Sequence, residues 1–164
     1  MKTRHAGDEM LLRLLEESYD KPAWHGPNLR GSLRGLTALE AAWKPASARH
    51  SIWELALHCA YWEYAVERKL AGGKRGSFPR KPSNFPAVPP EGGAREWKLD
   101  LELLDQGHAR LLRTVEEACA RLAPASEAGQ RARRLIRGAA SHNVYHAGQI
   151  RLLIRMSGAK RSRR

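Results

Sequence analysis

Apolar residues recur every three or four positions along four long segments of the chain, which is the spacing of helices that bury one face. The four predicted helices span residues 8–20, 51–71, 94–122 and 127–156. Shorter helical turns are expected at 32–36 and 37–43, and no segment alternates apolar and polar residues as a half-buried strand does. The pattern therefore predicts an all-α fold, in which four long helices with such seams pack as a four-helix bundle.

The ends of these helices carry recognisable signals. Asp8 is the expected N-cap of the first helix, and Ser51 and Glu54 have the spacing of a capping box at the start of the second. Gly72 follows the predicted end of that second helix. Residues 72–93 are rich in proline and glycine, and they are predicted to form a long crossover between the second and third long helices.

Four of the seven histidines occupy positions where a buried apolar residue is expected. His58 lies on the predicted seam of the second long helix, His108 on that of the third, and both His142 and His146 on that of the fourth. The fourth seam is expected to contain Leu135, Ala139, His142, His146, Gln149, Leu153 and Met156. Because an unpaired buried polar group is costly, four such histidines suggest a common cause, and the simplest is a metal ion in the bundle interior.

The spacing of His142 and His146 suits two ligands of one ion. Residues four apart share a helix face, with Cβ atoms roughly 6 Å apart. Two imidazoles do not complete a site, because a catalytic zinc usually has about three protein ligands and one open position. His58 is the best candidate for the third ligand. His108 is a weaker candidate, since a core histidine or a residue that supports a ligand would explain its position equally well.

Composition favours one folded domain over residues 1–164. The chain is 42% hydrophobic and contains five tryptophans, which argues against a disordered protein. No apolar run reaches the roughly 20 residues of a membrane span, and residues 1–5 lead into no apolar signal segment. Cys59 and Cys119 lack CxxC spacing, as expected of reduced thiols. These features predict a cytoplasmic protein without a membrane partner.

The formal net charge of +12 is concentrated near the C-terminus. After Glu127 the chain has ten basic residues and no acidic one, including a basic tail at 157–164. One interpretation is an anionic partner, either nucleic acid or a small acidic substrate drawn by the field. The other is a solvated helix face, on which late cations also suit the helix dipole.

Two stretches resemble the DinB/YfiT-like superfamily of metalloenzymes. One is the LxxH stretch of residues 52–58, which ends in His58, and the other is the HxxxHxGQ stretch of residues 142–150. The resemblance implies a four-helix bundle, often a homodimer, with one divalent metal held by three histidines. These fall on His58, His142 and His146.

The resemblance also implies two kinds of enzyme. One transfers a low-molecular-weight thiol, such as bacillithiol or mycothiol, and the other is a metal-dependent hydrolase. Three neutral imidazoles leave the ion its full charge, so it would activate the thiol or a water molecule. A bound thiolate suits zinc or nickel, the ions expected here, although imidazole ligands alone also suit iron and manganese. His25, His108 and Gln149 are candidates for an acid, a base or a group that orients a ligand, and a small-molecule substrate is expected.

A binding module is the alternative to an enzyme. In that interpretation the basic last helix contacts nucleic acid or another polyanion, and the metal is only structural. A structural zinc site is normally closed by four protein ligands, so the number of protein ligands distinguishes the two interpretations.

Overall fold

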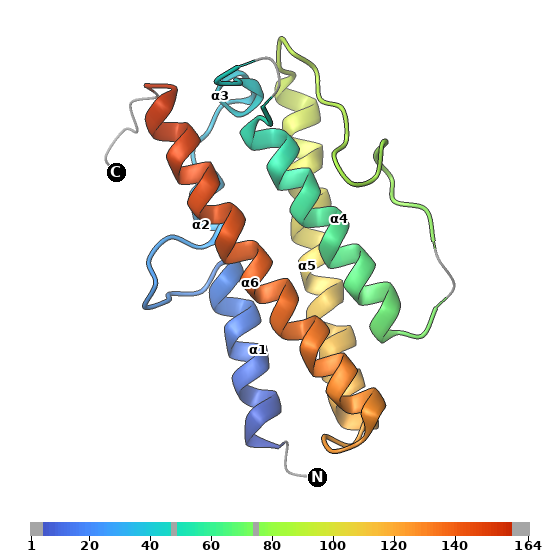
Figure 1. Ribbon diagram of the computed structural model, residues 1–164. Helices are drawn as coiled ribbons and strands as arrows, with labels where there is room; N and C mark the ends of the chain where they lie inside the picture. The colour runs from blue at the N-terminus through green and yellow to red at the C-terminus, as the bar shows by residue number, and fades with distance from the viewer. Residues whose placement is uncertain (1–4, 47–48, 74–75, 159–164) are drawn as a thin grey trace.

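The computed structural model describes residues 5–46, 49–73 and 76–158. It contains six helices: α1 (Ala6–Tyr19), α2 (Leu29–Leu33), α3 (Ala38–Ala42), α4 (Ile52–Leu70), α5 (Ala94–Arg121) and α6 (Glu127–Met156) (Figure 1). No strand occurs in this described part of the chain, so the prediction of an all-α fold is confirmed. The predicted basic tail at 157–164 lies largely outside it, since only 157 and 158 are described.

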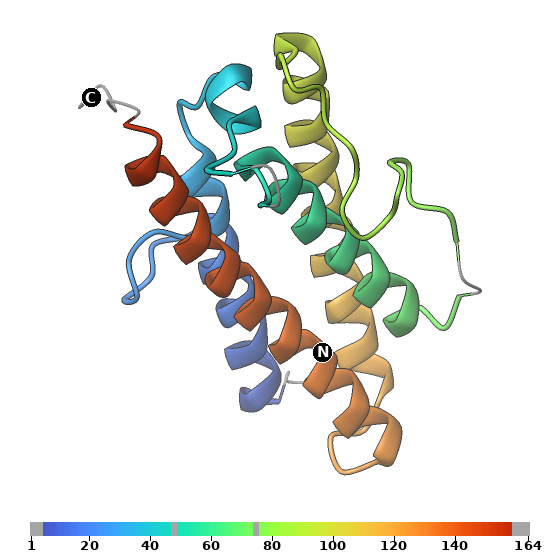
Figure 2. The same cartoon turned by 45° about the horizontal axis from the view of Figure 1, so that its top comes forward.

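The four long helices lie side by side. α6 packs between α1 and α4, and α5 packs along α4, as both views of the chain show (Figures 1 and 2). The short helix α2 packs on α6, and α3 packs on α4. Within the described ranges, no helix is both long enough and apolar enough to cross a membrane.

The start of α4 follows the predicted capping box. The Ser51 hydroxyl accepts a hydrogen bond from the Glu54 amide at 3.1 Å, and the Glu54 carboxylate accepts one from the Ser51 amide at 2.8 Å. The end also agrees with the prediction, because Gly72 adopts a φ of +69° just beyond the C-cap, a conformation that favours glycine.

Two short-range predictions were wrong. The residue that caps α1 is His5, whose Nδ1 accepts from the Gly7 amide, because Asp8 is already inside the helix and pairs with Arg133. The first short helix covers 29–33 instead of 32–36, because Asn28 accepts from the Gly31 amide and starts the helix earlier. Asparagine is among the preferred N-cap residues, and this signal was overlooked.

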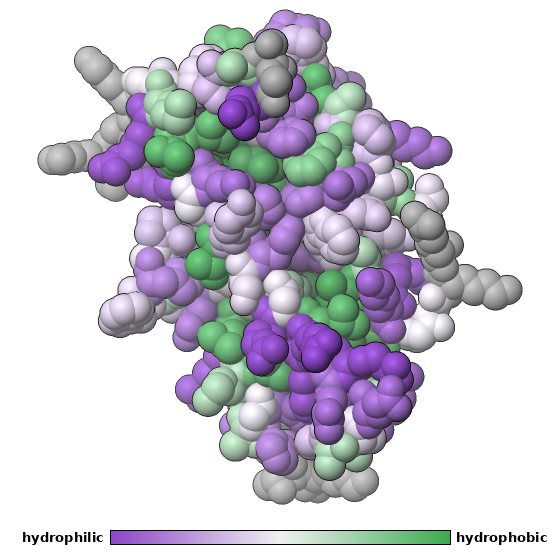
Figure 3. Space-filling model, in the orientation of Figure 1, coloured by the Kyte–Doolittle hydropathy of each residue, from purple (hydrophilic) through white to green (hydrophobic). Residues whose placement is uncertain are grey.

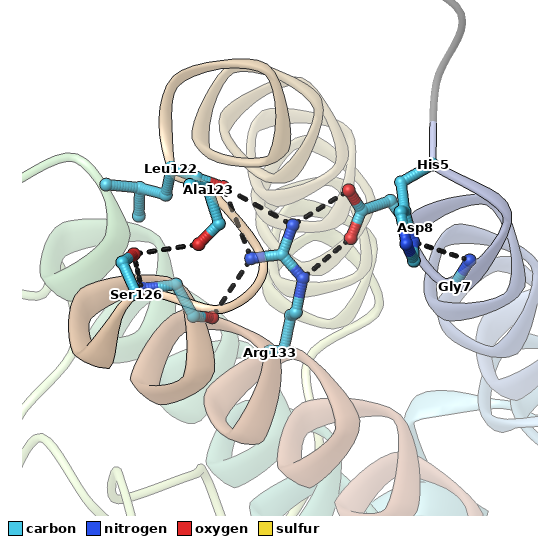
Figure 4. A network of polar contacts seen from close by, with 8 residues as sticks. His5, Gly7, Asp8, Leu122, Ala123, Ser126 and Arg133 are labelled. Atoms are coloured by element: carbon cyan, nitrogen blue, oxygen red, sulfur yellow. Dashed lines mark hydrogen bonds and ion pairs between the residues drawn. The ribbon is translucent and has the colours of Figure 1, made fainter.

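The pair between Asp8 and Arg133 joins the start of α1 to the start of α6 (Figure 4). Arg133 donates from Nε and Nη2 to the two carboxylate oxygens of Asp8, both at 2.8 Å. The same guanidinium donates to the Gly129 carbonyl at 3.1 Å and reaches the Leu122 carbonyl at the end of α5. One arginine therefore ties α1, the end of α5 and the start of α6 together.

The buried residues form two apolar clusters with a polar layer between them. One cluster gathers around Trp53 and Leu104, and the other around Leu111 and Ile136. The residues between the clusters are buried and polar: His58, Glu63, His108, Asn143 and His146. These five groups therefore lie close together along the helices, whereas the buried carboxylates Asp8 and Asp100 lie elsewhere.

The buried face of α6 differs from the predicted seam. Its core positions are Ala132, Ile136, Ala139, Ala140, Asn143, His146, Ala147, Ile150 and Ile154. Met156, predicted to be buried, is 56% exposed, and His142 is only partly buried. The reason is that α6 contacts both α1 and α4, so its buried face is centred between the two partners. His142 and His146 lie on the side of α6 that faces α4, where His146 is buried and His142 is partly exposed.

Residues 76–93 run back over α4 without forming a helix of their own. Its course is held by Asp100 of α5, which accepts from Arg80 Nε at 2.6 Å and from Trp53 Nε1 at 2.8 Å. Phe78 is buried against the aromatic side chains of α4. These contacts bring residues 84 and 85 beside His58.

Candidate metal centre

Three histidines from two helices converge where α4 and α6 lie side by side. His58 comes from the middle of α4, and His142 and His146 come from successive turns of α6. His142 Nε2 lies 3.2 Å from His58 Nε2 and 3.1 Å from His146 Nε2. The potential ligand atoms of all three lie within 4.8 Å of one another. The predicted trio is therefore brought together.

Hydrogen bonds at the outer nitrogens determine which ring nitrogen faces the centre. His58 Nδ1 lies 2.6 Å from the carbonyl oxygen of Asn84, which can only accept, so Nδ1 carries the proton. His146 Nδ1 lies 2.7 Å from Oε1 of Gln149, whose amide nitrogen in turn donates to the Tyr145 hydroxyl at 3.0 Å. In their neutral forms both rings therefore present an unprotonated Nε2 to the centre.

This arrangement is suited to a cation. The Nε2 atoms of His58 and His146 both lie at contact distance from His142 Nε2, and among the three neutral rings only His142 has an Nε2 that can carry a proton. One proton cannot satisfy three converging nitrogen atoms. For zinc, N–metal bonds of about 2.0–2.1 Å in a tetrahedron place the nitrogens about 3.3 Å apart. The separations of His142 Nε2 from His58 Nε2 and from His146 Nε2, 3.2 and 3.1 Å, are close to this value.

The protonation state of the trio also suits a metal. Burial, together with smaller contributions from the neighbouring His146 and His58, lowers the pKa of His142 to about 4. Burial likewise lowers the pKa of His58 and of His146 below the ordinary value of histidine. All three rings are therefore neutral at pH 7, which is the form that binds a metal ion.

Aromatic side chains enclose the centre on the side of α4. Phe85 stacks on the His58 ring with centroids 4.1 Å apart, and Trp62 lies 6.1 Å from the His142 ring. His58 and His146 are 7% and 6% exposed, whereas His142 is more open. Among the described residues, no cysteine, aspartate or glutamate joins the three imidazoles. The set thus has the three protein ligands of an open site.

His108 does not reach the trio. Its Nδ1 lies 2.9 Å from Glu63 Oε1, and its ring stacks on Tyr19 at 3.7 Å. The same glutamate oxygen accepts from Asn143 Nδ2 at 2.8 Å. His108 is therefore a core histidine that links α5 to α4 and α6, which is one of the two roles expected for it.

Of the two other candidate residues, one contacts the centre and the other does not. Gln149 holds His146, as one of its expected roles required. His25 is exposed and borders the surface next to Val144 and Gly148, on the opposite side of α6 from the two ligands. The structure thus brings Gln149 to the centre and leaves His25 away from it.

Sequence reasoning missed Asn84, Phe85, Glu63 and Asn143. Asn84 contributes its backbone carbonyl and Phe85 its ring. Both belong to an irregular segment, where no periodic pattern indicates which residues face the site. Glu63 and Asn143 sit on helices at buried positions, and a charged or amide residue at such a position signals a partner. To recognise Glu63 and Asn143 as buried, one must know which face of each helix packs against its neighbours. The spacing of apolar residues alone did not identify those faces.

Comparison with known proteins gives one match. The family model of the DinB superfamily matches residues 23–150, a range that includes all three converging histidines. No curated protein and no solved structure matches the chain. Since the match spans most of the chain, the protein belongs to the DinB superfamily.

Proposed function

We propose that the protein is a metal-dependent enzyme that holds one divalent transition metal ion between His58, His142 and His146 and uses it to activate a thiol or a water molecule. The convergence of three Nε2 atoms, two of them held in the metal-binding tautomer, carries this proposal. Zinc or nickel is the preferred ion, because both bind imidazole well.

The proposed reaction is transfer of a low-molecular-weight thiol or hydrolysis. An ion held by three neutral ligands keeps its full charge, so it would lower the pKa of bound water to about 7 or stabilise a thiolate. Asn84 and Gln149 keep the ligand rings oriented, and Phe85 and Trp62 exclude water from the back of His58 and His142. The proposal places this centre on a four-helix bundle with residues 72–93 as its crossover, in a homodimer.

The test is metal content. Protein purified without a nickel column is analysed by mass spectrometry, together with the His142→Ala, His146→Ala double variant. We expect about one transition metal per chain in the wild type and none in the double variant. His25→Ala is the matched control, since this exposed histidine lies on the opposite side of α6 and its loss should leave the metal in place.

A metal-free wild type that also fails to take up added zinc or nickel would remove the basis of the proposal. If the wild type does contain metal, X-ray absorption spectroscopy distinguishes an enzyme from a binding module with a structural metal. Three nitrogen ligands with an exchangeable oxygen or sulfur ligand support an enzyme, whereas four protein ligands support a structural metal.

The polyanion-binding alternative is weakened by the ion pairs of two basic residues in α6. Arg133 is paired with Asp8, and Arg131 lies 3.1 Å from Glu127. These contacts neutralise part of the charge that the sequence concentrates there. A metal-bound protein that shifts labelled DNA or RNA at physiological salt, with no exchangeable ligand on the metal, would favour this alternative.

A further inference from the structure

A mainly apolar cavity opens beside the three histidines, between the second half of α6 and the start of α4. Its volume is about 680 Å³, within the usual range of about 300–1,000 Å³ for small-molecule sites. His146 and Gln149 border it at one end. Figure 3 shows apolar side chains gathered in this part of the face, among polar ones. The cavity thus connects the candidate metal centre with the surface.

The wall of the cavity suits a molecule with an apolar body. Leu55 and Leu153 line it together with Leu152 and Met156, which are 58% and 56% exposed. Large apolar side chains that are this exposed and adjacent mark a contact site rather than a solvated surface. A polar or highly hydrated substrate would gain little from these contacts.

The other end of the cavity carries the positive charge of Arg49, next to His50. Arg49 and His50 line it, and no aspartate or glutamate of the described chain does so. The Arg49 guanidinium has no carboxylate partner among the described residues, whereas the exposed His50 lies 3.7 Å from Glu54. An arginine without a partner beside an apolar wall is suited to a carboxylate or a similar anion.

A stack of three rings sets the distance between the two ends. His50 stacks on Phe85 at 3.8 Å, and Phe85 stacks on His58 at 4.1 Å. The basic end is therefore two stacking distances away from a candidate ligand of the metal. A ligand that contacts both ends must have several bonds between its anionic group and the group that reaches the metal.

We propose that this cavity binds an amphipathic anion: a molecule with an apolar body whose single anionic head group is held by Arg49 and His50, and whose other end points toward His146. That this molecule is the substrate rests on the proposed metal-dependent function. The binding itself does not, so the two can be tested separately.

The test compares acids with their uncharged analogues by calorimetric titration of the protein as purified. The pairs are 4-phenylbutyrate with 4-phenylbutanol, and octanoate with octanol. We expect each acid to bind about fivefold to tenfold more tightly than its alcohol, because the head group gains a charge-assisted hydrogen bond. In Arg49→Gln this preference should fall to about twofold or less, while Arg113→Gln, a change of an exposed arginine outside the cavity, should retain it.

Two further variants locate the binding. Leu152→Glu places a negative charge on the exposed wall and should weaken both acids at least about tenfold, whereas Leu99→Glu, on the exposed side of α5, should not. His142→Ala should keep the preference for the acid. If His142→Ala loses that preference and Arg49→Gln keeps it, the metal holds the carboxylate and the proposal is wrong.

Equal affinity for acid and alcohol, or no measurable binding of either acid, would also overturn it. A wild type that contains no metal would refute the proposed function alone, because the acid preference can still be measured in that protein.

Discussion

Replacing Gln149 by leucine tests how strongly the ring orientation of His146 contributes to metal binding. Gln149 Oε1 accepts from His146 Nδ1 at 2.7 Å, and it is the acceptor that keeps the other ring nitrogen unprotonated toward the centre. Loss of such a partner typically lowers metal affinity about 10–100-fold. Gln149 is only partly buried, so water replaces part of the lost hydrogen bond. We therefore expect the lower end of this range, about tenfold, or about 1.4 kcal/mol.

The affinity is measured by competition for zinc with a chromogenic chelator at pH 7.5. Tyr145→Phe is the matched control: it removes only the oxygen that accepts from the Gln149 amide nitrogen, and Tyr145 is 62% exposed. We expect this control to change the affinity by about threefold at most. If Gln149→Leu binds zinc as tightly as the wild type, the hydrogen bond to His146 does not select the tautomer, and the argument for a preformed site fails.

Three further predictions concern stability. Burial lowers the pKa of His142 to about 4 in the folded, metal-free protein, while the unfolded chain takes up this proton near pH 6.5. The free energy of unfolding should therefore be fully retained above pH 6.5 and decline as the pH falls toward 4. Denaturation of EDTA-treated protein in this pH range should show a smaller decline for His142→Ala than for the wild type. An equal decline in both proteins would contradict the lowered pKa of His142. A double-mutant cycle of Asp8→Ala and Arg133→Ala, measured by urea denaturation, should give a coupling free energy of about 2 kcal/mol, because the ion pair is bidentate and mostly buried. A coupling below about 0.5 kcal/mol would show that water replaces the interaction between the two side chains. Asp100→Ala should lower the free energy of unfolding by about 3 kcal/mol, because Arg80 and Trp53 lose their acceptor. It should also weaken zinc binding, since the segment that carries Asn84 is no longer held in place. An unchanged zinc affinity would mean that other contacts hold this segment.

The helices and the histidine trio could be predicted because both depend on regular spacing. A four-residue interval puts His142 and His146 on one face whatever the packing, and His58 stands out as a polar residue in an apolar stripe. The capping box at Ser51 is equally local, and it was confirmed in detail.

The buried positions of α6 and the partners of the ligand rings depend instead on which face of each helix packs against which neighbour. Met156 was predicted to be a core residue because it continues the period of the histidines, but the buried face of α6 is centred between α1 and α4, and Met156 is left exposed. Leu153, one turn earlier, does pack against the core. The partners of the ligand rings were beyond prediction for another reason. Asn84 contributes a carbonyl, which every residue has, from a segment whose path follows from tertiary contacts such as that of Asp100.

The separation of the ligands along the chain has a consequence for unfolding. His58 and His142 are 84 positions apart, so an ion bound to both would act as a reversible cross-link that closes half of the chain into a loop. A cross-link of this length removes conformational entropy from the unfolded chain, and an ion that binds only the folded form adds its own binding free energy. The melting temperature would then report the free metal concentration, so that chelation loosens the hold of α6 on α4 and exposes the chain to proteases before any catalytic step is measured.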